Sequence, residues 1–540
     1  MNYPIEKPKL IDTGLGFSVF YKEKYLYSKR KPQKSILNLI ENTEIKEGTL
    51  ILCISPVLGY GLKELLQKMP NNTLALALEA DDNLAEISKN QIDKNIFNSD
   101  KMAYINSNSI PDFLKKAEPF IKEKKLRRIL CLDFSAGAYF YDDFYKKIEI
   151  FTQDYISRHW INRLTLIRFG RNYARNIFKN YRRIEKTYKN INFLQKNYVD
   201  KPILVLGAGT SLDIAGDFII KNRSNLFILS CDAVCCGLYP EIIPDAAVIL
   251  ESQYWIQKAF IGLAGSGISI FADLTANPKA VFCTEGSISF FFTEYFSHPF
   301  FDKMQEQNIL PLQFEPMGSV GLSALSIAKK IALADVPVFH TGLDFSWKNG
   351  FTHSKFGFQT VSAFSENTKL QPLYNPQVIF PEKLQKLKGK KDKQEFCFSS
   401  PALKNYGDIY KNAFSHVNNL FDLGTEGLCI GSVQKTFEEA EQIIKHYIQN
   451  KSSAPKYKED ANLNIEGISS FLSCEKNKLT ELKDIFTGKK IAEDNYTKEL
   501  IKSAPYLYFH FPDYDKINIT DSNFLNRLRI EIEYFLKILS

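Results

Sequence analysis

A glycine-rich turn directly after an apolar segment is the feature of this sequence with the clearest chemical meaning. Residues 205–213 read V-L-G-A-G-T-S-L-D, which predicts a buried strand, a turn and the start of a helix. Gly207 and Gly209 permit positive φ and close backbone approach, while Thr210 and Ser211 stand where a helix N-terminus would face phosphate oxygens. The turn therefore suits an anionic ligand, although a tight helix–strand junction would need the same glycines.

A second turn of small residues follows further along the chain. Gly318 and Ser319 precede a run of Leu, Ser, Ala and Ile over 322–328 that predicts a helix. A helix that begins at glycine and serine presents a second N-terminus to an anion. Two such starts in one sheet are harder to explain by packing alone.

Polar residues at the predicted ends of further strands are candidates for contact with a ligand. In a parallel α/β sheet, ligands bind beyond the carboxyl ends of the strands. Asp232 could accept hydrogen bonds from a ribose there, or it could cap the helix that follows it. The other candidates at strand ends are Glu251, Ser252, Gln253, Thr284 and Asp344.

His353 is the best candidate for a general base among the seven histidines. It lies in a predicted loop beside aromatic residues, soon after Asp344. A neutral imidazole near its ordinary pKa can take a proton from an attacking hydroxyl group. A lone histidine in a loop is equally compatible with a structural role.

The elements that must position these residues alternate between strand and helix, so the sequence predicts an α/β protein of several domains. We expect a central domain at 201–431 with a doubly wound, mostly parallel sheet, interrupted by a loop or lid around 351–410. Residues 432–540 have helical patterns and predict a helical C-terminal domain. The expected central strands are 203–206, 226–231, 246–250, 268–272, 280–283 and 336–341.

Residues 1–150 predict a separate Rossmann-like domain. Apolar strands at 50–55, 74–78 and 128–132 alternate with helices, and Glu79 follows the second strand, where a ribose could be held. Ser-Pro-Val stands where the first glycine of a nucleotide-binding turn is expected. We therefore favour a degenerate, structural domain over an active methyltransferase.

A basic segment at 151–200 connects the two predicted domains. Aromatic residues interleave with its basic residues at helical spacing, a pattern that nucleic-acid-binding helices can show. We favour a connecting helix with a solvated basic face that lines a cleft for an anionic substrate, and we expect no nucleic acid partner. The basic residues are Arg158, Arg163, Arg168, Arg171, Arg175, Lys179, Arg182, Arg183, Lys186 and Lys189.

Composition argues against several classes of protein. The chain has 540 residues, and no window supplies the ~20 uncharged apolar residues that a membrane-spanning helix needs. The N-terminus lacks the basic-then-apolar order of a secretory signal, so we expect a cytoplasmic protein. The nine cysteines form no C-x-x-C pair, which argues against a zinc site and a disulfide framework.

The ordered series of motifs resembles the central domain shared by bacterial motility accessory factors (Maf) and the archaeal 6-hydroxymethylpterin pyrophosphokinases called MptE-like. The family usually has proline where Thr210 stands and aspartate where Glu251 stands. A Rossmann-like N-terminal flank and a helical C-terminal flank resemble the Maf proteins, as does the G-R-N-Y-A-R-N sequence that begins at Gly170. The matching motifs are G-A-G-T-S-L, D-A, P-D, E-S-Q, G-S-V, G-L-D and T-H, beginning at residues 207, 232, 244, 251, 318, 342 and 352.

This resemblance implies a flagellin glycosyltransferase with a sialyltransferase-like central fold. Such an enzyme would transfer a nonulosonic acid, of the sialic, pseudaminic or legionaminic type, from a CMP-sugar to Ser or Thr of flagellin, which supports filament assembly and motility. The two small-residue turns would hold phosphate and ribose with no obligatory metal, and His353 would deprotonate the acceptor, with Asp344 at the same rim. Arg171 would contact the sugar carboxylate or the flagellin.

Two other functions stay open at this point. The chain could transfer diphosphate from ATP to a hydroxymethylpterin, with Mg²⁺ held by Asp232, Glu251 or Asp344. It could also be a flagellin-binding chaperone that keeps the pocket without turnover. The nucleotide that binds and the mass of flagellin distinguish these alternatives.

Overall fold

A computed structural model describes residues 7–121, 124, 126–187, 190–295, 299–347, 351–370, 385–390, 396–450, 463–512 and 517–540. The side chains of Arg158 and Arg163, together with Lys189 and residues 371–384 and 391–395 of the expected lid, lie outside the described part. The chain forms two compact units, Met1–Leu164 and Thr165–Ser540. Helix α5 (Asp142–Lys186) begins in the first unit and ends in the second.

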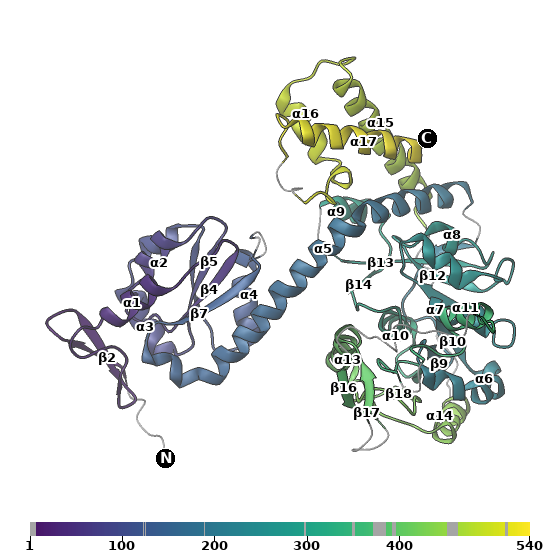
Figure 1. Ribbon diagram of the computed structural model, residues 1–540, viewed down its shortest axis with the longest axis horizontal. Helices are drawn as coiled ribbons and strands as arrows, with labels where there is room; N and C mark the ends of the chain where they lie inside the picture. Colours follow the sequence, from purple (N-terminus) through teal and green to yellow (C-terminus); the bar gives the residue numbers. More distant parts are fainter. Residues whose placement is uncertain are drawn as a thin grey trace. The chain divides into compact units, whose positions relative to one another are not determined.

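The first unit is built on a four-stranded parallel sheet with the order β6 (Met102–Asn106), β5 (Leu74–Glu79), β4 (Thr49–Ile54) and β7 (Arg128–Asp133). Every residue of β4 and β5 is buried, as their apolar sequences predict for parallel strands that are covered on both faces. The other elements are β1 (Lys9–Asp12), β2 (Phe17–Tyr21), β3 (Lys24–Tyr25), α1 (Lys34–Asn42), α2 (Leu62–Lys68), α3 (Asp82–Gln91) and α4 (Ile110–Ile121) (Figure 1).

The carboxyl edge of this sheet satisfies its own polar groups. The Glu79 carboxylate accepts hydrogen bonds from the backbone N–H groups of Ala80 and Asp81, both at 3.0 Å, and from Ser55 Oγ at 2.8 Å. Asp81 in turn forms an ion pair with Lys22 at 3.0 Å. Glu79 is completely buried and bonded within its own domain, and the degenerate character of the domain stays a prediction.

A nine-stranded sheet that is parallel at every pairing forms the core of the second unit, which confirms the expected fold class. Its path runs through β14 (Gln313–Phe314), β13 (Ile288–Thr293), β12 (Ser269–Asp273), β11 (Ala246–Ile249), β10 (Phe227–Cys231), β9 (Ile203–Leu206), β15 (Val338–Thr341) and β18 (Leu420–Asp422), and β8 (Ile191–Phe193) pairs with β13.

Helices cover both faces of this sheet. Along β9, Ile203 and Val205 belong to one apolar core, and Leu204 and Leu206 belong to another, as alternation along a strand requires. The first core includes α10 (Val320–Ile331) and α13 (Pro401–Phe414), and the second includes α6 (Gly216–Asn222), α7 (Asp232–Leu238) and α14 (Phe437–Asn450) (Figure 1).

The strand order reverses at β9, which has β10 on one side and β15 on the other. Leu206 and Thr341 are partners in the register, so β9 and β15 end at the same level. In open α/β sheets, the crevice beyond the carboxyl ends at such a reversal is the usual ligand position. The glycine-rich turn directly follows β9, and Asp344 lies three residues after the end of β15.

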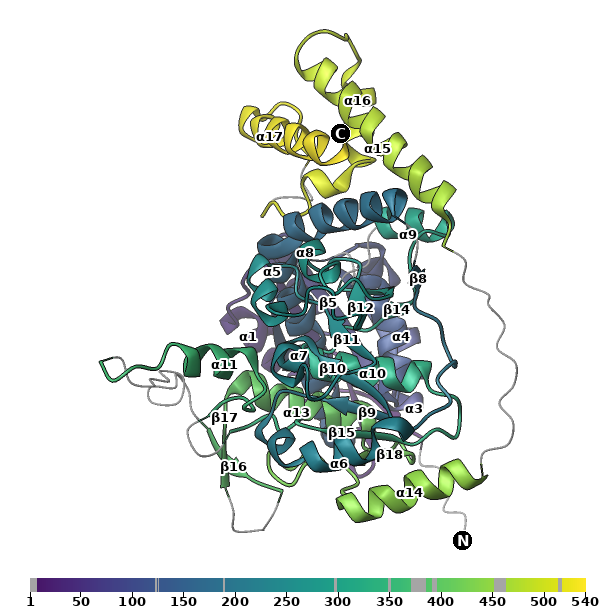
Figure 2. The ribbon, with the colours of Figure 1, turned by 90° about the vertical axis from the view of Figure 1, so that its right-hand side faces the viewer.

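The C-terminal helices pack against the second half of α5 (Figure 2). The Phe178 ring of α5 lies 4.9 Å from Tyr506, 5.8 Å from Phe535 and 6.1 Å from Phe471, measured between centroids. These helices are α15 (Ile465–Phe486), α16 (Asp494–Lys502) and α17 (Ser522–Leu539). None of the described helices combines the length and the apolar character needed to cross a membrane.

Two expectations about secondary structure are wrong. Residues 280–283 are not a strand, because the first two belong to α8 (Pro278–Val281) and the next two to the turn after it, and Asn277 caps this helix by accepting a hydrogen bond from the N–H of Lys279. The next strand is β13, which starts at Ile288. The expected loop also contains regular elements, namely α11 (Phe358–Ser365), the antiparallel pair β16 (Gln385–Lys388) and β17 (Phe396–Ser399), and most of α13.

Candidate functional site

The glycine-rich turn packs tightly against the segment that leaves β15. The N–H groups of Gly207 and Gly209 donate to the carbonyls of Thr341 and Gly342, each at 2.8 Å. A Cβ at either glycine would overlap atoms of Gly342, and at Gly209 also the carboxylate of Asp344. The close packing of this turn against the segment after β15 therefore requires glycine at both positions, whether or not a ligand binds there.

Asp344 occupies the anion position of this turn. Its carboxylate accepts a hydrogen bond from the backbone N–H of Ser211 at 2.8 Å and another from the Ser211 hydroxyl. The residue is only 2% exposed, and burial raises the pKa of its carboxyl group. Asp344 and Ser211 satisfy each other in this structure, and the catalytic role of Asp344 and the phosphate contact of Ser211 stay predictions.

A buried charged cluster lies beside this pair. Lys390 Nζ forms an ion pair with Asp422 Oδ2 at 2.7 Å, and both side chains are nearly inaccessible to solvent. Asp422 also accepts a hydrogen bond from Ser432 Oγ at 2.6 Å. The positive charge of Lys390 favours the ionised forms of Asp422 and Asp344 and so compensates part of their burial. No local pattern predicts this cluster, since Lys390 and Asp422 are far apart in the chain.

A cavity of about 390 Å³, which we call the His353 cavity, opens next to the turn. His353 Nδ1 lies 2.9 Å from Thr352 Oγ1, and burial lowers the pKa of the imidazole, which is therefore neutral at neutral pH. When Nδ1 carries the proton and donates to Thr352, Nε2 is a free base with no partner among the described residues. The cavity is lined by Thr210, Ser211, Asp213, Ile214, Phe351, His353, Lys355, Thr360, Phe364, Thr425 and Glu426.

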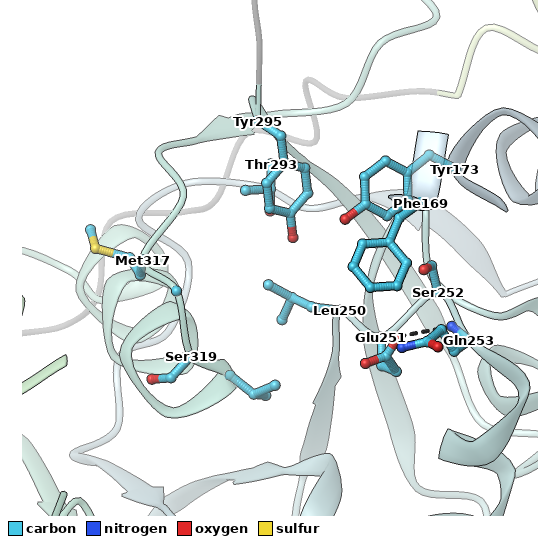
Figure 3. Close-up of a pocket in the computed structure, with 12 residues that line it drawn as sticks. Phe169, Tyr173, Leu250, Glu251, Ser252, Gln253, Thr293, Tyr295, Met317 and Ser319 are labelled. Carbon is cyan, nitrogen blue, oxygen red and sulfur yellow. Dashed lines mark hydrogen bonds between the residues drawn. The ribbon is translucent and has the colours of Figure 1, made fainter. Parts of the chain in front are cut away.

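A second cavity of about 200 Å³, which we call the Glu251 cavity, lies at the carboxyl ends of β11 and β13 (Figure 3). Glu251 Oε1 accepts a hydrogen bond from the N–H of Gln253 at 2.8 Å, which holds the carboxylate in the loop after β11. The rings of Tyr173 and Tyr295 stack with 5.4 Å between centroids and form an aromatic wall. The lining residues are Phe169, Tyr173, Leu250, Glu251, Ser252, Gln253, Thr293, Tyr295, Met317, Gly318, Ser319 and Val320.

Helix α10 begins in the wall of the Glu251 cavity. Ser319 is its N-cap, because its hydroxyl accepts a hydrogen bond from the N–H of Leu322 at 3.2 Å. Gly318 has φ of 76°, a conformation that favours glycine over other residues. The positive end of a twelve-residue helix therefore adjoins the cavity, as the Gly-Ser start predicted.

Asp232 follows β10 and is almost completely buried, with 4% of its surface exposed. Its Oδ2 has no hydrogen-bond partner in the described structure. The pKa of the carboxyl group is raised to about 7, mainly by burial and in smaller part by the neighbouring Glu251 carboxylate. Asp232 does not line either cavity.

Two predicted site residues lie elsewhere. Thr284 is buried and donates to the carbonyl of Ile268 at 2.7 Å, at the amino end of β12, because the strand expected before it is helix α8. Arg171 Nε forms an ion pair with Glu531 at 2.8 Å, and its guanidinium lies 4.0 Å from the ring centre of Tyr534. Arg171 therefore ties α5 to α17, and it is absent from the lining of both cavities.

The sequence reasoning missed the aromatic wall of the Glu251 cavity. Phe169 and Tyr173 are four residues apart on α5, a spacing that places them on one helix face. Thr293 and Tyr295 do not stand at a predicted strand end, because the sequence pattern predicts a strand at 280–283, whereas the strand is β13 at Ile288–Thr293. The aromatic spacing in α5 was a usable signal, but it does not say what the aromatic face covers.

The chain is similar to known proteins in sequence and in fold. A family model described as 6-hydroxymethylpterin diphosphokinase MptE-like matches residues 175–350. An uncharacterized protein of Treponema pallidum (strain Nichols) is 35% identical over 553 residues, covering 99% of this chain and 96% of the relative. The solved structure of MAf glycosyltransferase from Magnetospirillum magneticum AMB-1 has a TM-score of 0.58 at 12% identity, covering 100% of this chain and 92% of that one.

Proposed function

We propose that this chain, which belongs to the motility accessory factor family with an MptE-like central domain, is a glycosyltransferase that uses a nucleotide-activated sugar. The observation that carries the proposal is the place of His353 in the lining of a cavity beside the glycine-rich turn, where burial lowers the pKa of the imidazole. A second cavity at the same edge, with a helix N-terminus and a carboxylate, offers room for a sugar. The fold shared with a Maf glycosyltransferase supports this assignment.

The donor in this proposal is a CMP-activated nonulosonic acid, and the acceptor is a Ser or Thr hydroxyl of flagellin. The acceptor oxygen attacks the anomeric carbon, and the bond from that carbon to the phosphate oxygen breaks. CMP leaves with the electron pair, while His353 Nε2 takes the acceptor proton. A single displacement of this kind inverts the anomeric centre.

The polar groups at the edge divide the work of binding. The N-terminus of α10 attracts the negative charge of phosphate or of the sugar carboxylate, so the scheme needs no obligatory metal. The Glu251 carboxylate accepts hydrogen bonds from sugar hydroxyl or amide groups, and the Gln253 side chain donates hydrogen bonds to sugar oxygens. The stacked rings of Tyr173 and Tyr295 cover the apolar face of the sugar.

Mass spectrometry of flagellin tests the proposal. Flagellin co-expressed with this chain and a nonulosonic acid pathway should gain the mass of the sugar. His353→Ala should lower the transfer rate by about 10²–10⁴-fold, because the general base is lost, while CMP still raises the melting temperature. His416→Ala, a change at an exposed histidine, is the control and should leave transfer intact. Full activity of His353→Ala would refute the role of His353.

The match to the MptE-like model favours one further candidate, a diphosphotransferase that uses ATP and Mg²⁺. The carboxyl groups of Asp232 and Glu251 are close enough to influence each other and could hold the metal. A thermal shift with ATP, Mg²⁺ and a hydroxymethylpterin, and none with CMP or CTP, would support this candidate and refute the sugar transfer. Binding of CMP with unmodified flagellin would instead indicate a chaperone.

A further inference from the structure

Helix α5 presents one polar and aromatic stripe to the functional edge of the sheet. Phe169, Tyr173, Asn176 and Asn180 follow one another at intervals of four, three and four residues, so they share a helix face. The two aromatic residues line the Glu251 cavity (Figure 3). The two asparagines are completely buried, and the Nδ2 group of each donates to backbone carbonyls, whereas the Oδ1 atom of Asn180 has no hydrogen-bond partner in the described structure.

Asn176 joins two loops that follow neighbouring strands. Its Nδ2 donates to the carbonyl of Ser252 at 2.9 Å and to the carbonyl of Thr275 at 2.8 Å. Its Oδ1 accepts a hydrogen bond from Arg175 Nε at 2.9 Å, and Arg175 Nη2 also reaches the Ser252 carbonyl at 3.4 Å. Both amide hydrogens of Asn176 and its oxygen are therefore engaged, which fixes the orientation of the side chain.

Ser252 lies between Glu251 and Gln253, and all three residues line the Glu251 cavity. Its side chain is buried, while the N–H of Gln253 donates to Glu251. The carbonyl of Glu251 accepts a further hydrogen bond from the N–H of Asn277 at 2.9 Å. Removal of Asn176 would leave the Ser252 carbonyl with only the longer bond from Arg175. The loop would then be free to shift toward another donor.

We infer that Asn176 is a positioning residue, which holds the segment Glu251 to Gln253 in the geometry that the donor sugar needs. The inference rests on the proposed function, in which the Glu251 cavity receives the sugar. A displacement of about 1 Å in a binding segment can cost up to about 10²-fold in rate. The buried Asn176 amide can therefore control how well the segment Glu251 to Gln253 binds the donor sugar.

Asn180 supplies a matched control one helical turn later. Its Nδ2 also donates to two backbone carbonyls, those of Leu274 at 2.9 Å and Ala276 at 3.2 Å, and it is equally buried. These carbonyls belong to the loop after β12, and that loop contributes no residue to the lining of the Glu251 cavity. Loss of either asparagine removes the same kind of bond, but only Asn176 contacts the loop that carries Glu251.

The test compares Asn176→Leu with Asn180→Leu in the full chain. We expect similar losses of melting temperature, but a rise of about 10-fold or more in KM for the donor sugar in Asn176→Leu alone. Hydrogen exchange without any ligand should become faster at 252–257 in Asn176→Leu alone, and at 274–277 in both variants, because both asparagines bind carbonyls of that loop. Equal effects of the two variants on KM and on exchange at 252–257 would overturn the inference.

Two further measures keep the test decisive. If Asn176→Leu does not fold, Asn176→Ser with Asn180→Ser replaces the pair, and the same comparison applies. A wild-type chain without donor turnover refutes the proposed function, whereas the exchange experiment still shows whether Asn176 holds the loop. An active wild type with unchanged KM in the Asn176 variants refutes the positioning role alone.

Discussion

Substitution of Asp232 by asparagine should stabilise the second unit at alkaline pH. The carboxyl group is buried, one of its oxygens has no partner, and its pKa is raised from 3.8 to about 7, mainly by burial. In the unfolded chain the same group ionises near its ordinary value. Between these two pKa values the folded state binds more protons than the unfolded state, so the free energy of unfolding falls as pH rises. Asparagine cannot ionise and removes this loss.

The magnitude follows from the pKa shift. From about pH 5 to about pH 7, each pH unit lowers the free energy of unfolding of the wild type by roughly 1.4 kcal/mol, and above that range the loss is complete. The advantage of Asp232→Asn should therefore grow by about 3 kcal/mol between about pH 5 and about pH 8. For a unit of roughly 380 residues this corresponds to a melting temperature higher by about 4 °C.

Urea unfolding and scanning calorimetry at the two pH values provide the assay, with the transition of the second unit followed separately. Glu79→Gln is an informative comparison, because the pKa of Glu79 is also raised to about 7. The stability of Glu79→Gln relative to the wild type should rise with pH in the same direction, but from a lower starting value, because glutamine loses an oxygen that accepts hydrogen bonds from Ser55 or from two backbone amides. An advantage of Asp232→Asn that does not change with pH would refute the reasoning.

Two further predictions concern residues that make close contacts within the protein. Gly209→Ala should destabilise the chain by about 1–3 kcal/mol in thermal unfolding, because its Cβ would overlap Asp344. The control Gly216→Ala meets no atom within 4 Å and should change little, and equal losses would contradict this account. Arg171→Met should lower stability by about 1–3 kcal/mol, because the nearly buried Glu531 loses its partner, with KM for the donor unchanged; a raised KM would restore Arg171 to the site.

Local patterns predicted the framework of the site well. The apolar run at 203–206 correctly predicts β9, and the glycines that follow it correctly predict the turn after this strand. Gly318 and Ser319 correctly predict the start of α10. These predictions succeed because strand alternation, glycine conformation and helix capping depend on neighbouring residues. The strand expected at 280–283 failed because a short apolar run fits a helix as well as a strand, and Asn-Pro capping decided the outcome.

The partners of polar groups could not be predicted from the sequence. The sequence pattern suits Ser211 to a phosphate, and in this structure Asp344, which follows β15, accepts the hydrogen bonds that Ser211 donates. Arg171 was assigned to the substrate, but it forms an ion pair with Glu531 on α17. In both cases a charged group satisfies a need within the protein that a ligand could also satisfy, and only the long-range packing shows which of the two occurs.

The sequence by itself determined the parallel α/β architecture and the turn from strand to helix at Gly207 and Gly209. It also determined that a histidine follows Asp344 in the chain. Periodicity and turn chemistry are local properties. The tertiary structure alone decided that these features form two cavities at one edge of the sheet and that α5 supplies a wall of one of them. It also decided that Asn176 holds the loop carrying Glu251. A helix face that carries polar residues has no defined role until the groups packed against it are known.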